Sequence, residues 1–107
     1  MIEATYHRQF NRLTIEGHAY SGDPGHDLVC ASASILAFTL ADRVGAMAVA
    51  QQAKEPIREL APGKAEISCK PNTRYKATVT LIFDSICAGF ELLAHSYPAN
   101  IHYEILG

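Results

Sequence analysis

The segment from Val29 to Val49 places the strongest constraint on how this chain can fold. Its apolar residues recur at the spacing of one face of an α-helix, at Val29, Ala33, Leu36, Leu40, Val44 and Met47. Ile35, Phe38 and Val49 widen the apolar surface beyond one stripe. A helix with so much apolar circumference must be covered on more than one side. We expect it to lie against a sheet, with a second helix or a partner subunit on its remaining surface.

Segments of alternating apolar and polar residues accompany this helix and predict strands. Residues 2–7 and 13–16 alternate on either side of a turn at 9–12, which predicts an antiparallel hairpin. Beyond the helix, the patterns predict a connection over 53–63, a strand over 65–70, a turn over 71–74, a strand over 75–81, a helix capped by Asp84 and ending at Pro98, and a last strand over 101–105. The order ββαββαβ predicts a single α+β domain over residues 1–107, in which two helices pack on a mixed sheet of about five strands.

The composition narrows the class of protein. A chain of 107 residues with 49% hydrophobic and 19% charged residues is typical of one globular domain. A net charge of −2 without a basic run argues against a direct nucleic-acid partner. The longest apolar stretch, residues 31–41, is interrupted by polar residues and is shorter than the about 18 residues of a membrane helix. The N-terminus begins with strand-like alternation rather than a signal peptide. We expect a cytoplasmic protein with no membrane partner.

The helix is preceded by the segment GHAYSGDPGHDLVCASAS, residues 17–34, which brings a cysteine to the helix start. Asp27 stands directly before the apolar pattern and is interpreted as the N-cap. Cys30 is then in the first turn, where free N–H groups and the helix dipole favour an anion such as a thiolate. The same N–H groups are candidates for an oxyanion hole.

A histidine in this segment completes a candidate pair. His18 lies twelve positions before Cys30, at the end of the second predicted strand and in phase with its polar face. A loop of this length can fold back, so that His18 takes the proton of the Cys30 thiol and later protonates a leaving amine. Gly22 and Gly25 permit the backbone turns that would let the loop open for a substrate.

Other readings of these residues stay open. A helix-start cysteine is not diagnostic, because DSICA at 84–88 mirrors DLVCA at 27–31, and Cys87 is interpreted as a small packing residue. Ser34 is expected either to bond within the site or to bond the carbonyl four residues earlier, and Asp27 has orienting His18 as a second possible role. The set of His18, His26, Asp27 and Cys30 matches no zinc spacing, and the chain has no CxxC pair. We expect three reduced cysteines, no metal and no cofactor.

The pattern of this segment matches that of a known family. The matching residues are Gly17, His18, Ala19, Gly25, Asp27, Leu28, Val29, Cys30, Ala31 and Ser34, with the same twelve-residue spacing from histidine to cysteine. In these residues the chain resembles the ribosomal-processing cysteine protease Prp family. The resemblance implies a small, cytoplasmic, homodimeric bacterial cysteine protease that removes a short N-terminal extension from a large-subunit (50S) ribosomal protein.

The resemblance also implies a role for each matching position. The nucleophile falls on Cys30 and the histidine on His18, while Asp27 and Ser34 match supporting positions. Residues 20–26, which include Gly22 and Gly25, match a mobile loop that admits the peptide. Pro24 and His26 depart from the family's loop, which puts the opening motion in question more than the chemistry.

We therefore expect a cysteine endopeptidase with a Cys30–His18 dyad that acts on an extended ribosomal-protein peptide, bound along a strand edge. The main alternative is a non-catalytic ribosome-assembly factor that binds the same ribosomal protein without cutting it. A third is a different thiol enzyme, such as an acyl transferase or amidase. The assembly factor predicts that Cys30→Ser keeps function. The different thiol enzyme predicts dependence on Cys30 and His18 without cleavage of the ribosomal peptide.

Overall fold

The computed structural model describes residues 1–18 and 26–107, apart from the side chains of His26 and Asp27. Within these residues the elements are β1 (Ile2–His7), η1 (Arg8–Phe10), β2 (Arg12–Glu16), α1 (His26–Val49), β3 (Ala53–Ala61), β4 (Lys64–Pro71), η2 (Thr73–Tyr75), α2 (Lys76–Ser96) and β5 (Ile101–Leu106). The predicted order ββαββαβ and the α+β class are confirmed.

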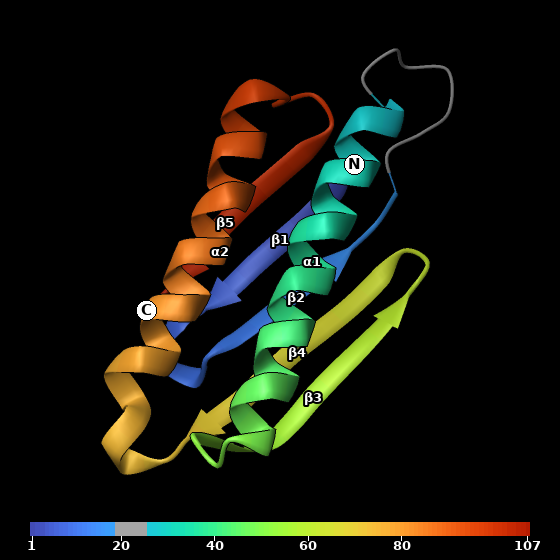
Figure 1. Cartoon of the computed structure of the whole chain (residues 1–107). Helices are drawn as coiled ribbons and strands as arrows, with labels where there is room; N and C mark the ends of the chain where they lie inside the picture. The colour runs from blue at the N-terminus through green and yellow to red at the C-terminus, as the bar shows by residue number, and fades with distance from the viewer. Residues whose placement is uncertain (19–25) are drawn as a thin grey trace.

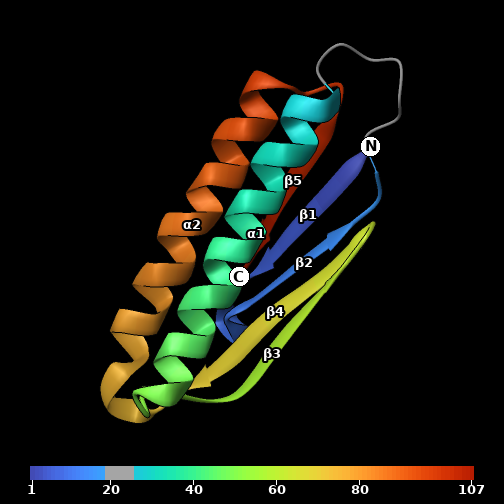
Figure 2. The same ribbon diagram turned by 45° about the vertical axis from the view of Figure 1, so that its right-hand side comes forward.

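The described strands form one mixed sheet in the order β3-β4-β2-β1-β5 (Figure 1). The pair β1–β5 is parallel, and the other neighbouring strands are antiparallel. Both helices cover the same face of the sheet, which leaves a two-layer molecule (Figure 2). The helices approach closely where Leu36 of α1 lies against Gly89 of α2, because a Cβ at Gly89 would come within 2.7 Å of the Leu36 side chain.

The core lies between the two layers and takes alternate residues of the strands. Ile2, Ala4 and Tyr6 of β1 are buried, as period-two alternation predicts. The predicted apolar stripe of α1 is buried too, except that Leu36 is only partly covered. Ile35 and Phe38, by contrast, are 63% and 54% exposed. The sheet and α2 therefore bury one side of α1. Its outer side, which was expected to be covered as well, stays exposed in the described part of the chain.

The second hairpin was predicted in the wrong place. Residues 53–61, expected as a connection, form the edge strand β3, which pairs with β4. Pro56 is tolerated there because the ladder is irregular between Lys54 and Ile57, on an edge strand. Residues 75–81, expected as a strand, lead into and begin α2. The alternation at 75–81 was too short to exclude a helix, and the buried set Val79, Phe83, Cys87, Phe90 and Leu93 follows the helical period.

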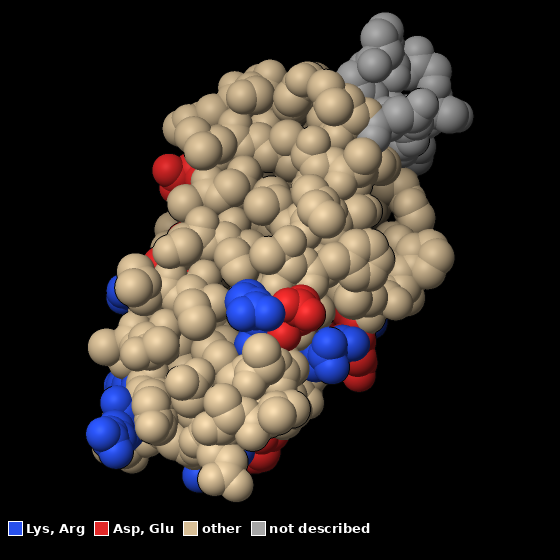
Figure 3. Space-filling model, in the orientation of Figure 1, with Lys and Arg blue, Asp and Glu red and all other residues tan. Residues whose placement is uncertain are grey.

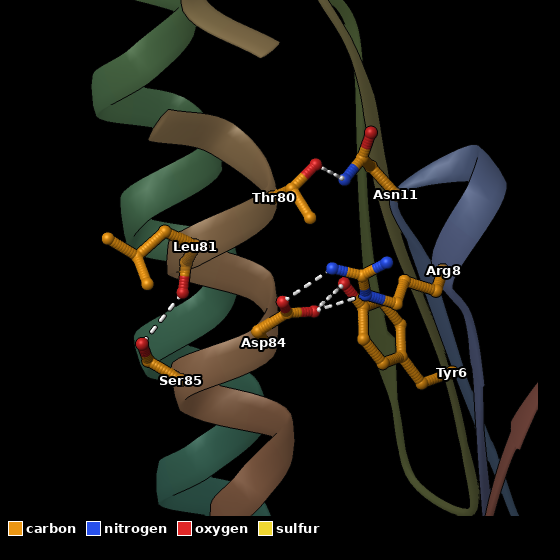
Figure 4. A network of polar contacts seen from close by, with 7 residues as sticks. All are labelled: Tyr6, Arg8, Asn11, Thr80, Leu81, Asp84 and Ser85. Carbon is orange, nitrogen blue, oxygen red and sulfur yellow. Dashed lines mark hydrogen bonds and ion pairs between the residues drawn. The ribbon is translucent and has the colours of Figure 1, made fainter. Parts of the chain in front are cut away.

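Asp84 was predicted to cap the second helix, but it lies in the middle of α2 and joins it to the sheet (Figure 4). The Tyr6 hydroxyl donates to Asp84 Oδ1 at 2.8 Å. Arg8 donates from Nε to Oδ1 and from Nη2 to Oδ2, each at 3.0 Å. The hydrogen bond from Arg8 lowers the pKa of the Asp84 carboxyl, while burial and the bond to Asp84 raise the pKa of Tyr6. Asn11 adds a bond from Nδ2 to Thr80 Oγ1 at 3.2 Å, so that two links hold α2 to the end of β1 and η1.

Two helical segments, 28–49 and 73–96, are long and apolar enough to cross a membrane by length and composition alone. The expectation that no segment reaches this length was wrong, because the alanines, serines and threonines between the large apolar residues do not interrupt such a span. Both segments pack on the sheet here, and the core helix of a soluble protein passes the same test. The two helices are therefore weak evidence for a membrane.

Candidate active site

A cavity of about 400 Å³ lies beside the N-terminal half of α1. His18, which follows β2, and Cys30 and Ser34 of α1 all line it. Its other walls are mostly apolar and come from the first residue of β1, the end of β2, α1 and the β3–β4 hairpin. The structure therefore brings three of the predicted site residues to one cavity. The Asp27 side chain, Gly22 and Gly25 lie outside the described residues.

Gly17 explains how His18 reaches this cavity. The alternation of β2 predicted His18 on the polar face of the strand, but β2 ends at Glu16 and Gly17 has a φ of +94°. This left-handed conformation breaks the phase of the strand. A Cβ at Gly17 would also collide with the carbonyl oxygen of Met1. The N-terminal ammonium of Met1 donates to the His18 carbonyl oxygen at 2.9 Å, so the backbone at His18 is held on that side.

Cys30 lies deeper in its helix than predicted. α1 begins at His26, so Asp27 is its second residue and Cys30 its fifth, and the interpretation of Asp27 as N-cap is corrected. The unpaired N–H groups of a helix start belong to its first turn, before Cys30, although the positive end of the dipole remains close to the thiol. Cys30 is partly exposed, which leaves its sulfur accessible from the cavity.

The other two cysteines are buried and poorly suited to chemistry. Burial raises the pKa of the Cys69 thiol to about 11. Burial and, to a lesser degree, the Asp84 charge raise the pKa of the Cys87 thiol to about 12. The interpretation of Cys87 as a packing residue is confirmed, although it lies inside α2 rather than at a helix start. Cys30 is therefore the thiol that combines access with a cavity.

Ser34 lies one turn beyond Cys30 and faces the same cavity. The bond to the carbonyl four residues earlier, weighed for Ser34, is made by its neighbour Ser32, whose Oγ donates to Leu28 O at 2.7 Å. Among the described residues no group of three histidine, cysteine, aspartate or glutamate side chains is arranged to hold a metal ion. His26 and Asp27 of the zinc alternative belong to the side chains that are not described.

Sequence reasoning missed the β3–β4 hairpin as a wall of the site. Leu60, Ala61, Pro62, Gly63 and Lys64 line the cavity, but this segment was predicted as a connection. The Pro62–Gly63 dipeptide is a turn signal, and it stands directly before the alternating segment 65–70. Giving that signal more weight than Pro56 would have placed a turn at 62–63.

Comparison with known proteins identifies the family of the chain. The family model described as cysteine protease Prp matches residues 1–102. Among solved structures, SMU.848 from Streptococcus mutans is 28% identical with a TM-score of 0.71, over 99% of this chain and 94% of that one. The essential ribosomal processing protease Prp from S. aureus, in complex with a substrate peptide, is 22% identical with a TM-score of 0.71, over 99% and 100%.

A second structure of the S. aureus protease holds a covalently linked product peptide; it is 22% identical, with a TM-score of 0.69 over 98% of this chain and 97% of that one. No curated protein matches the chain. At this identity the S. aureus structures show the shared fold, while the family model, which covers nearly the whole sequence, shows the class of enzyme. The chain belongs to the cysteine protease Prp family.

Proposed function

We propose that this cysteine protease removes a short N-terminal extension from a large-subunit (50S) ribosomal protein, with Cys30 as nucleophile and His18 as general base. The observation that carries the proposal is that a partly exposed cysteine and a histidine, from segments joined by the loop, line one cavity. The S. aureus relative supports the choice of substrate, because it is a ribosomal processing protease that was crystallised with a substrate peptide.

The proposed reaction uses these two side chains in turn. His18 accepts the proton of the Cys30 thiol, and the thiolate attacks the carbonyl carbon of the scissile peptide bond. The tetrahedral intermediate collapses as the C–N bond breaks, and the His18 imidazolium gives its proton to the departing amine. Water then attacks the thioester with His18 as base, which releases the carboxylate product and restores the thiol. The positive end of α1 favours the negative charge that develops beside Cys30.

The walls of the cavity favour an extended peptide with apolar side chains. The cavity is bounded by Phe38 of α1 and by Leu60 of β3, both of which are partly exposed. β3 is an edge strand, and no other described strand pairs with its outer side. An edge of this kind can add a peptide strand through main-chain hydrogen bonds, while pockets select side chains. We place the peptide along β3, with its scissile bond at Cys30.

Mass spectrometry of the full-length extended ribosomal protein, incubated with the wild type and with Cys30→Ala, tests the proposal. We expect one cut near the end of the extension, present with the wild type and absent with the variant. No cut from a folded wild-type enzyme would favour the non-catalytic assembly factor. Cuts in other peptides but not in this one would favour a thiol enzyme of different specificity.

We also propose that the protein is a cytoplasmic homodimer whose subunits meet on the outer side of α1. Figure 3 shows few charged side chains over the upper part of the visible face, formed by the N-terminal half of α1 and the C-terminal half of α2. Leu28, Ile35 and Leu92 are exposed on these segments. Exposed apolar patches of this kind mark interaction surfaces. We expect light scattering to give twice the chain mass for the wild type and the single chain mass for Ile35→Glu; a wild-type monomer would contradict this.

A further inference from the structure

The turn between β3 and β4 lies directly against the His18 side chain. Gly63 has a φ of +75°, and a Cβ added there would lie 2.6 Å from His18 Cε1, 3.0 Å from Cδ2 and closer still to Nε2. Real Cβ atoms do not approach other heavy atoms this closely. The imidazole therefore occupies space that is free only because residue 63 has no side chain.

The same turn also holds the backbone next to His18. The Gly17 N–H donates to the Gly63 carbonyl oxygen at 3.0 Å. This bond extends the β2–β4 ladder beyond its last pair, Glu16 and Lys64. Gly17, which precedes His18, is thus hydrogen-bonded to Gly63, which lies against the His18 ring. Backbone and side chain of His18 are both placed by one glycine.

The turn itself is not the one that a hairpin of this length favours. Pro62 restricts φ to about −65°, and a positive φ at Gly63 then gives the pattern of a type II turn. Two-residue hairpin loops favour types I′ and II′, which need a positive φ at the first central residue and suit the twist of the strands. Departures from a local preference of this kind are expected at functional sites, where another requirement decides the geometry.

From these contacts we infer that Gly63 is a positioning residue of the protease. It sets the place of the His18 imidazole in the cavity that Cys30 also lines. The inference rests on the proposed role of His18 as the base. Because Leu60 and Ala61 of the same hairpin line the cavity, a peptide that binds along β3 would press on the turn that holds the histidine.

The test compares Gly63→Ala and Gly63→Asn with the wild type. Asparagine tolerates a positive φ better than alanine, so a loss shared by both variants comes from the Cβ rather than from backbone strain. We expect kcat for the peptide to fall about 100-fold in both, because a misplacement of about 1 Å costs this much, while KM changes little. Gly89→Ala is the matched control, since the atoms nearest to its Cβ belong to the Leu36 side chain and not to His18. It should retain the kcat of the wild type.

A second readout does not depend on the substrate. The rate at which iodoacetamide alkylates Cys30 is measured against pH in the wild type, Gly63→Ala and His18→Ala. We expect the two variants to share one profile that differs from the wild type, because both lose the imidazole from its place. A folded Gly63→Ala with the kcat and alkylation profile of the wild type overturns the inference, and so does an alkylation profile common to all three proteins. A wild type that does not cleave the ribosomal peptide, but keeps its distinct profile, contradicts only the substrate.

Discussion

Replacing Cys30 or His18 with alanine is expected to reduce peptide cleavage on the order of 10⁴-fold, and replacing both is expected to reduce it little further. The two side chains line one cavity, and in the proposed reaction each acts only through the other. Without Cys30 there is no group to form the thioester. Without His18, the thiol lacks its proton acceptor and the leaving amine lacks its donor. Residues that act as a unit therefore give losses that do not add.

The measurement is kcat/KM for each single variant and for the double variant, with unfolding followed for each to show that the fold is kept. Cys69→Ala is the matched control, because Cys69 is a buried thiol in β4 whose pKa burial raises to about 11. It should cleave at the rate of the wild type. Losses that multiply in the double variant would show that Cys30 and His18 act independently, which the dyad does not allow.

The parts of the fold that the sequence predicted correctly are those with long or repeated periodicity. The helix 29–49 shows more than five turns of helical spacing, and α1 ends at the predicted Val49. The first hairpin has alternation that agrees with a buried face, and both it and β5 lie where they were predicted, although in β5 only Ile101 is buried. In these segments local preference and tertiary packing point to the same structure.

The errors came from short segments in which two patterns compete. Residues 75–81 alternate, but only Tyr75 and Val79 of this segment fit the helical face that continues through Phe83 and Cys87, while Leu81 is exposed. Local alternation could not reveal the buried face of α2, which runs from Val79 to Leu93. Residues 53–61 contain Pro56, but an irregular edge strand requires no N–H at that position. In both segments the deciding factor was the place of the segment in the whole fold: an edge of the sheet for 53–61 and the start of a packed helix for 75–81.

The candidate site was predictable in its residue types but not in its walls. The spacing from His18 to Cys30 indicated a pair, and both residues line the cavity. The contact between His18 and Gly63 joins residues 45 positions apart, and it depends on a hairpin that the sequence reading did not contain. The backbone conformation of Gly17 was also not predictable from the alternation. Its positive φ redirects the His18 side chain, which the alternation had assigned to the polar face of the strand.

The second large effect is expected at Asp84, where replacement by alanine should lower the free energy of unfolding by about 2–3 kcal/mol. Most of this loss comes from Tyr6, which is fully buried and would keep a hydroxyl without its acceptor. The ion pair with Arg8 contributes less, because both side chains are partly exposed to solvent. Urea unfolding at one protein concentration measures the change. Tyr6→Phe should cost about 1 kcal/mol in the wild type but raise the stability of Asp84→Ala, because there it removes a buried hydroxyl without an acceptor. Equal costs in both backgrounds would contradict the assigned bond.

The charge of Asp84 adds a dependence on pH with a defined sign. Arg8 holds the pKa of the Asp84 carboxyl below its usual range in the folded protein, while in the unfolded chain it returns to about 3.9. The unfolded state thus binds the proton more readily, and the stabilisation is fully present above the unfolded value and is lost as the pH falls through the folded value. Asp84→Asn keeps an acceptor for Tyr6 but cannot titrate. The difference in unfolding free energy between wild type and Asp84→Asn should therefore be constant from pH 7 to 5 and shrink below about pH 4; a constant difference down to pH 2 would place the stabilising charge elsewhere.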